Sequence, residues 1–325
     1  MRSGLFADFL LAFCLLLAAE VAVRVLLPHD VSGRFAYGYD RQAGFVEAGD
    51  TVRLVRAGGR RFHPQTFSRQ RPAATLRIMV VGDSVPRGPS LAASYPKQLE
   101  ALLNAAGCRA EVINLAVAGF GVRRTQLIIQ KILDYEPSLI IWHLNDSNEY
   151  EDEREYRRSQ EFQGWHPRHW LMQSYILGRA YEFKTEKLQW RLLPDKIRQQ
   201  QMLNDADAEL AASLDAHQQQ LWRQRVWQTS RETVALLRQR GIPVILVLQA
   251  AWQQDHHGPG HLADHGLAAL GQEVAGPGVQ VLAMADLFGQ CNPLSRYFAD
   301  SAHLTPAGHQ LLAQALGAMI LTPAK

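Results

Sequence analysis

The sequence predicts an α/β protein, a doubly wound three-layer α/β/α sandwich with a mainly parallel five-stranded sheet. Short β-branched runs alternate with longer segments of helical periodicity, which favours parallel strands joined by right-handed helical crossovers. The run Ile78–Val81 is apolar throughout, as expected for a strand that is covered on both faces. The chain has 325 residues, of which 47% are hydrophobic, so it can bury the core of one large domain with appendages or of two small domains.

Five strands and five helices are expected from residue 76 onward. The strands are Leu76–Val81, Glu111–Leu115, Leu139–His143, Val244–Leu248 and Val279–Leu282. The helices are Leu91–Ala106, Thr125–Tyr135, a long helix ending near Arg240, Leu262–Val274 and Pro306–Ile320. The second and fifth strands are expected on opposite flanks of the sheet, so Cys108 and Cys291, which lie beside them, are not expected to form a disulfide.

The first segment, residues 1–28, is expected to be a membrane anchor. Leu5–Leu27 is strongly apolar, and its uncharged core, Phe9–Ala19, has the length of the apolar region of a signal peptide. The candidate cleavage site is imperfect, however, and Glu20 and Arg24 are spaced to pair on a helix near an interface. We therefore favour an uncleaved anchor, with the main domain in the periplasm or at the cell surface. Secretion after cleavage of a signal peptide and an amphipathic helix of a soluble protein are the alternatives.

Two further segments flank or interrupt the predicted sandwich. Residues 29–74 are rich in glycine and arginine, and we expect an extended juxtamembrane arm with a hairpin around Thr51–Val55. In the main domain, residues 75–325, about a hundred residues separate the third strand from the fourth, where a helical crossover needs about a dozen. The first part of this connection, about 150–215, starts acidic and turns aromatic. We expect a helical cap over the site, whose aromatic side chains either pack the insert, rest at a membrane or stack on a sugar.

Composition and motifs exclude several classes of function. A formal net charge of +3 with scattered arginines gives no basic stripe for nucleic acid. Three cysteines without CxxC spacing indicate neither a disulfide framework nor a zinc site, and no cofactor is expected. Gly119-Phe120-Gly121 starts a dinucleotide-binding pattern, but Arg124 occupies the place of its third glycine. His256, His257 and His261 share a loop without an ordered ligand geometry, so a metal role is not expected.

Four short segments are expected at the carboxyl edge of the sheet, where open α/β sheets bind ligands. They are Gly82-Asp83-Ser84 after the first strand, Asn114–Gly121 after the second, His143-Leu144-Asn145-Asp146 at the end of the third, and Asp300-Ser301-Ala302-His303 before the last helix. Each segment alone has a plain structural interpretation, such as a loop serine, a turn glycine, a capping asparagine or a surface histidine. Their convergence on one edge favours chemistry.

This set of segments resembles the SGNH hydrolases, the GDSL-type lipase and esterase family. The family carries GDS near its amino end, a glycine after the second strand, Asn-Asp after the third and DxxH near its carboxyl end, and the resemblance covers residues 76–325 apart from the insert. The sequence departs from the family pattern at His143 and at Ala116, where glycine is usual. We interpret His143 as a packed strand-end residue; the alternative is a titratable group that narrows the site or joins its hydrogen bonds.

The resemblance and the chemistry of acyl transfer assign the same roles. Ser84 is the expected nucleophile and His303 is the base that takes its proton, while Asp300 fixes the tautomer of the imidazole. The expected oxyanion hole combines the backbone N–H groups of Ser84 and Gly119 with the side chain of Asn145, a neutral amide donor.

We therefore expect a serine esterase that hydrolyses a short acyl ester, such as an acetyl ester, through an acyl-serine intermediate. A glycan of the cell envelope or an exopolysaccharide is the expected alcohol, by analogy with the family and from the expected location. Two alternatives stay open: an O-acyltransferase with the same residues, and a non-catalytic protein that binds an envelope glycan. The expected partners are an acyl ester substrate and, through the N-terminal segment, a membrane; no nucleic acid is expected.

Overall fold

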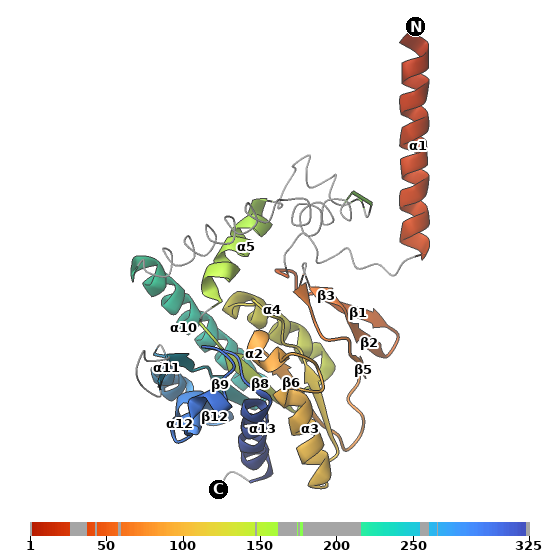
Figure 1. Cartoon of the computed structure of the whole chain (residues 1–325). Helices are drawn as coiled ribbons and strands as arrows, with labels where there is room; N and C mark the ends of the chain where they lie inside the picture. The colour runs from red at the N-terminus through yellow and green to blue at the C-terminus, as the bar shows by residue number, and fades with distance from the viewer. Residues whose placement is uncertain are drawn as a thin grey trace.

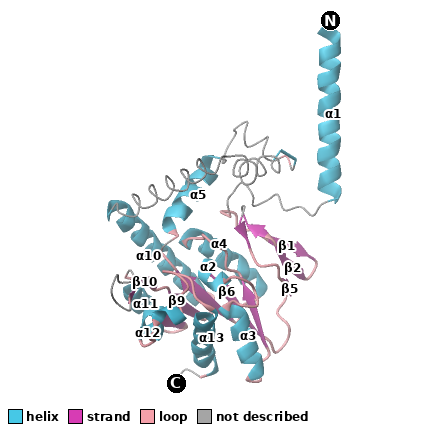
Figure 2. Cartoon of the chain, viewed as in Figure 1, coloured by secondary structure: helices cyan, strands magenta, loops and turns pink. Residues whose placement is uncertain are grey.

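The structure is a computed structural model of the chain. It describes residues 2–26, 38–42, 44–57, 60–146, 148–161, 174, 176–177, 216–253, 260–264 and 266–322. Helices lie on both faces of a central sheet, with a smaller sheet at one side (Figures 1 and 2).

The central sheet has five parallel strands in the order β12-β9-β8-β6-β7. The strands are β6 (Leu76–Val81), β7 (Ala110–Asn114), β8 (Leu139–Leu144), β9 (Val244–Leu248) and β12 (Val279–Ala283). The predicted α/β fold and its parallel five-stranded sheet are confirmed, and the second and fifth predicted strands do form the two edges. The chain leaves β6 toward one edge and returns to β8 on its other side, so the strand order reverses at the carboxyl end of β6, where such sheets bind ligands.

The two faces of the sheet carry separate cores. Ile78 and Val80 of β6 pack against α3 (Tyr95–Ala105), α12 (Met284–Gly289) and α13 (Pro306–Leu321). Met79 and Val81 point the other way, because side chains alternate along a strand, and pack with α4 (Val122–Ile132), α10 (Ala216–Gln239) and α11 (Leu267–Val274). Figure 1 shows α3 and α13 side by side on one face. Burial on both faces explains why Ile78–Val81 is apolar at every position.

The predicted arm, residues 29–74, contains a small antiparallel sheet. It joins β1 (Phe45–Ala48), β2 (Thr51–Leu54) and β5 (Thr66–Ser68), and β3 (Arg56–Ala57) and β4 (Arg60–Arg61) form a separate two-stranded sheet. The expected hairpin around Thr51–Val55 is therefore part of a three-stranded sheet. Phe45 and Phe67 pack on Tyr135 of the main domain, with ring centroids 5.8 and 5.3 Å away. Through this contact the three-stranded sheet packs against the core of the main domain.

Several element boundaries differ from the predictions for identifiable reasons. The helix expected at Leu91–Ala106 begins at Tyr95, because Ser94 takes the cap position and a proline follows it. The helix expected at Thr125–Tyr135 begins at Val122, and its last three residues form the 3₁₀ turn η1. The prediction of a helix from Leu262 is wrong at its start, because β11 (His261–Ala263) pairs with β10 (Ala251–Gln253). A second 3₁₀ turn, η3 (Leu294–Arg296), precedes the last loop.

The N-terminal segment forms helix α1 (Arg2–Leu26), which carries large exposed apolar side chains. Among the residues that the structure describes, no helix is long and apolar enough to span a membrane. Glu20 of α1 accepts hydrogen bonds from Ser174 Oγ (2.8 Å) and the Ile176 backbone N–H (3.0 Å). Most of the predicted cap, about 150–215, lies outside the described residues; its described beginning is helix α5 (Glu149–Glu161).

Candidate active site

The first predicted segment places Ser84 directly after β6. Ser84 is the first residue of the short helix α2 (Ser84–Arg87), and Asp83 caps this turn by accepting a hydrogen bond from the Val85 N–H (3.0 Å). Gly82 is required by close packing, since a Cβ there would lie 2.6 Å from Pro86 and 2.9 Å from the Cβ of His143. The strand therefore ends in a tight turn that presents a partly exposed serine at the sheet edge.

The fourth segment brings an imidazole and a carboxylate to this serine. His303 Nε2 lies 2.9 Å from Ser84 Oγ, although the two residues are 219 positions apart in sequence. The other ring nitrogen, Nδ1, lies 2.8 Å from Asp300 Oδ2 and 3.0 Å from Oδ1. The three side chains lie in series, in the order that a nucleophile, a base and an orienting acid would take.

The turn around Asp300 is stabilised by hydrogen bonds between its own residues, 300 to 303. Its carboxylate also accepts hydrogen bonds from the backbone N–H groups of His303 (2.7 Å) and Ala302 (2.9 Å). Burial works to raise the pKa of Asp300, but these two N–H groups and the imidazole outweigh it, so the pKa lies below the ordinary value for aspartate. The Asp300 and His303 side chains are 56% and 49% exposed, so the pair is accessible to a large substrate.

The second and third segments lie against the same turn. Val117, in the loop after β7, donates its N–H to the Gly82 carbonyl (3.1 Å), and two residues on Gly119 has a φ of +76°, which favours glycine. Asn145, directly after β8, donates from Nδ2 to Asp83 Oδ2 (2.5 Å). Asn145 and the loop after β7 that carries Gly119 therefore lie beside the turn that carries Ser84.

Arg124 stabilises the loop that carries Gly119, a role that the sequence did not suggest. Its guanidinium donates to the Gly119 carbonyl, to Asp152 Oδ1 (2.7 Å) and to Glu155 Oε2, and it lies over the ring of Phe120 at 4.3 Å. The Arg124 and Asp152 side chains are both fully buried. Sequence analysis missed this arginine because its acidic partners lie about thirty positions away, in the insert.

Helix α5 caps the start of α4 with two buried carboxylates. Glu149 Oε1 accepts the Val122 N–H (2.9 Å), and Asp152 Oδ1 accepts the Gly121 N–H (3.2 Å). Burial is the largest effect on Glu149 and the neighbouring Asp152 charge adds to it, which together raise the pKa of Glu149 to about 8. The first turn of the insert is therefore packed against the loop that carries Gly119.

His143, which stands where the family usually has glycine, is buried, as predicted. Its side chain is 2% exposed, with Nε2 2.7 Å from Gln249 Oε1 and Nδ1 3.3 Å from the Tyr95 hydroxyl. Burial lowers the pKa of His143 and outweighs the opposing effects of Asp83 and Gln249. His143 joins the hydrogen bonds behind the site, so the alternative interpretation also holds in part.

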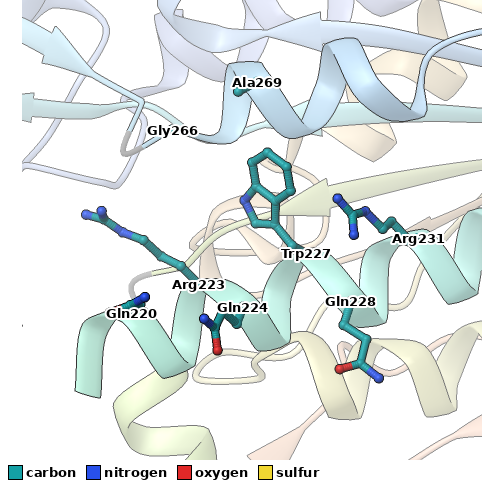
Figure 3. A pocket seen from close by; sticks show the side chains of 8 residues that line it. All are labelled: Gln220, Arg223, Gln224, Trp227, Gln228, Arg231, Gly266 and Ala269. Carbon is teal, nitrogen blue, oxygen red and sulfur yellow. The ribbon is translucent and has the colours of Figure 1, made fainter. Parts of the chain in front are cut away.

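The described residues outside the Ser84 site include no candidate metal centre. His256 and His257 lie outside the described residues, and within the described part no group of three or more His, Cys, Asp or Glu side chains could hold a metal. A groove of about 760 Å³ runs between α10 and α11, with Trp227 flanked by Arg223 and Arg231 (Figure 3). None of its lining residues belongs to the Ser84 site.

A serine, an imidazole and a carboxylate in series, at the carboxyl edge of a doubly wound sheet, define the class of serine hydrolases. A sequence model of the GDSL-like lipase/acylhydrolase family matches residues 80–311. The chain belongs to this family of serine ester hydrolases, as its four segments predicted. Among curated proteins, no sequence matches the chain.

Several esterases are among the solved structures that align with this chain. An acetyl xylan esterase, AlAXEase, is 12% identical and aligns with a TM-score of 0.46 over 75% of this chain and 100% of its own. Axe2, an acetylxylan esterase from Geobacillus stearothermophilus, is 14% identical with a TM-score of 0.46 over 76% of this chain and 94% of its own. A lipolytic G-D-S-L family protein from Veillonella parvula is 14% identical with a TM-score of 0.41 over 76% of this chain and 98% of its own.

Proposed function

We propose that this protein hydrolyses short acyl esters, such as acetyl esters, through an acyl-Ser84 intermediate. The observation that carries the proposal is the chain of contacts from Ser84 Oγ to His303 Nε2 (2.9 Å) and from His303 Nδ1 to Asp300 (2.8 Å). These distances lie within the range of hydrogen bonds that transfer protons between a nucleophile and its base.

In the first half of the reaction, Ser84 Oγ bonds to the ester carbonyl carbon while its proton moves to His303 Nε2. The carbonyl oxygen takes up the negative charge, facing the N–H groups of Ser84 and Gly119 and the amide of Asn145. Collapse of this tetrahedral species breaks the bond to the alcohol, which leaves with the proton from His303. In the second half a water molecule repeats these steps on the acyl-serine, while Asp300 accepts the Nδ1–H throughout and stabilises the imidazolium.

A solvated glycan is the alcohol that we propose. The catalytic carboxylate and imidazole are about half exposed, so a large polar leaving group can approach them without being buried itself. A sugar hydroxyl could replace water as the acceptor in the second half of the reaction, which would make the same site an acyltransferase. The acceptor alone separates these two activities.

Chromogenic acetyl, butyryl and octanoyl esters test the proposal on the full-length protein in a mild nonionic detergent. We expect the fastest turnover with the acetyl ester, and a loss of about a thousandfold or more in Ser84→Ala. Ser301→Ala, which removes a hydroxyl from the same site loop, is the matched control and should retain activity. Turnover that survives Ser84→Ala would refute the nucleophile; labelled acyl groups that appear on an added glycan instead of in water would identify a transferase.

We also propose that α1 attaches the protein to a membrane, with the catalytic domain outside the cytoplasm. Exposed apolar side chains along α1 support this, including Phe9 (77% exposed), Phe13 (60%) and Val25 (79%). Membrane fractions washed with carbonate should retain the full-length protein, whereas a variant without residues 1–28 should be released. Release of both would refute the attachment.

A further inference from the structure

A buried chain of hydrogen bonds runs behind the active site, from α3 to the loop that carries His303. Tyr95, His143 and Gln249 are 0%, 2% and 5% exposed. The Tyr95 hydroxyl lies 3.3 Å from His143 Nδ1, and His143 Nε2 lies 2.7 Å from Gln249 Oε1. The Gln249 Nε2 group then donates to the carbonyls of Ala250 (2.8 Å) and Ala302 (3.1 Å).

The two carbonyls fix the direction of every hydrogen bond in this chain. A carbonyl only accepts, so the NH₂ group of Gln249 faces Ala250 and Ala302, and its Oε1 must accept from His143. His143 therefore carries its proton on Nε2. Its Nδ1 is then an acceptor for the Tyr95 hydroxyl, which agrees with a ring that burial keeps neutral. Each polar atom has a partner of the right kind, which makes the chain a rigid support.

The contacts between His303 and Asp300 do not by themselves set the distance of the His303 imidazole from Ser84. The hydrogen bonds between Asp300 and the His303 imidazole and backbone all lie within four residues of sequence. Two hydrogen bonds connect this loop to the end of β9 and the residues after it: Gln249 Nε2 to the Ala302 carbonyl, and the Trp252 N–H to the Ser301 carbonyl (2.7 Å). Of these two, the Gln249 contact joins the residue next to His303.

We propose that Gln249, oriented by His143, is a positioning residue for the ester hydrolysis proposed above, because its bond to the Ala302 carbonyl keeps His303 within reach of Ser84. His143 stands where the family usually has glycine, so this support belongs to this chain rather than to the family pattern. The inference rests on the proposed function and adds to it a part of the site that does not touch the substrate.

Gln249→Leu tests the proposal in the full-length protein, with Gln228→Leu, the same change at an exposed position on α10, as the matched control. Because a displacement of about 1 Å can cost about a hundredfold in rate, we expect kcat for the acetyl ester to fall by roughly tenfold to a hundredfold in Gln249→Leu. KM should stay within about twofold, since the lost interaction does not bind the substrate. The pH midpoint of kcat/KM should not move, because the Asp300 contacts are intact; Asp300→Asn, which changes those contacts, should move it.

His143 supplies a second pair of variants with a rescue. His143→Leu removes the donor to Gln249 and should lower kcat, while His143→Gln places an amide N–H at the reach of Nε2 and should restore much of the lost rate. Thermal unfolding followed by tryptophan fluorescence will show whether Gln249→Leu folds. If it does not fold, the two His143 variants test the positioning role in its place.

Three results would overturn the positioning role: a kcat for folded Gln249→Leu within about twofold of the wild type, a loss accompanied by the pH shift of Asp300→Asn, or a His143→Gln variant no better than His143→Leu. Failure of the proposed function would be seen in the wild type itself. A wild type that neither turns over acetyl esters nor reacts with a fluorophosphonate at Ser84 would remove both proposals, whereas an active and labelled wild type with an unaffected Gln249→Leu removes only the positioning role.

Discussion

Replacing Glu149 by glutamine should make the stability of the protein much less dependent on pH. Glu149 is fully buried at the start of α5, where its Oε1 accepts the Val122 N–H and its Oε2 has no hydrogen-bond partner. Burial and the neighbouring Asp152 charge raise the pKa of Glu149 to about 8. The folded protein therefore keeps the Glu149 proton at neutral pH, while the unfolded chain releases it at acidic pH.

The sign and size of the effect follow from this difference. Between the unfolded value of 4.5 and the folded value of about 8, the folded state binds one proton more, so the free energy of unfolding decreases as the pH rises. The difference is about 3.5 pH units, and at about 1.4 kcal/mol for each unit the decrease reaches up to about 5 kcal/mol near pH 8. Glutamine resembles the protonated acid in shape and does not titrate, so the variant should lack this decrease.

Urea denaturation of the wild type and of Glu149→Gln, at a series of pH values from 5 to 8.5, measures the effect directly. We expect the two proteins to be similar near pH 5 and the variant to be more stable by several kcal/mol near pH 8. Glu232→Gln, an exposed glutamate on α10, should follow the wild type at every pH. A Glu149→Gln variant whose stability falls with pH as steeply as that of the wild type would refute the protonated state of this side chain.

Two further predictions concern the oxyanion hole and the acid stability of the fold. Asn145→Ala should lower kcat by about a hundredfold or more with little change in KM. Asn148→Ala removes the other amide that donates to Asp83 and should lower kcat much less. Equal losses of kcat in the two variants, measured by steady-state kinetics, would show that Asn145 acts by supporting Asp83 and not by binding the oxyanion. Burial, with His143 and His303 nearby, lowers the pKa of His309 to about 4, so the unfolded chain binds a proton more readily below about pH 6.5 and stability falls toward pH 4. His309→Phe should reduce this acid-induced loss, by up to about 3 kcal/mol at pH 4, and identical thermal unfolding profiles of variant and wild type from pH 7 to 4 would contradict the argument.

The parts of the fold that the sequence predicted are those with a local signal. Leu76–Val81 and Val244–Leu248 have the predicted bounds, because buried parallel strands are apolar runs that end sharply at turn residues. The site residues were found for a related reason: each one follows a strand or precedes a helix, and the topology of the sheet then brings them together. The family pattern added the expectation of which residues would meet.

The parts that were missed depend on partners far away in sequence. The acidic start of the insert is typical of an exposed surface, yet Glu149 and Asp152 are fully buried, with one oxygen of each bound by the N-terminus of α4 and Asp152 also paired with Arg124. Gln249 has no pattern of its own; only its contacts with His143 and Ala302 distinguish it from an ordinary polar residue after a strand. The strands β10 and β11 have only three residues each, which is too short for a clear alternation of apolar and polar positions.

The 219 positions between Ser84 and His303 also fix the order in which the enzyme is made. During synthesis the nucleophile emerges well before its base, and the sheet strands up to β12 can pair while the serine still lacks a proton acceptor. In the proposed reaction, Ser84 gains its base only when α13 docks on α3 and the His303 loop reaches its place. A cut in the loop before α13 should therefore abolish the proposed ester hydrolysis while the strands of the sheet stay paired.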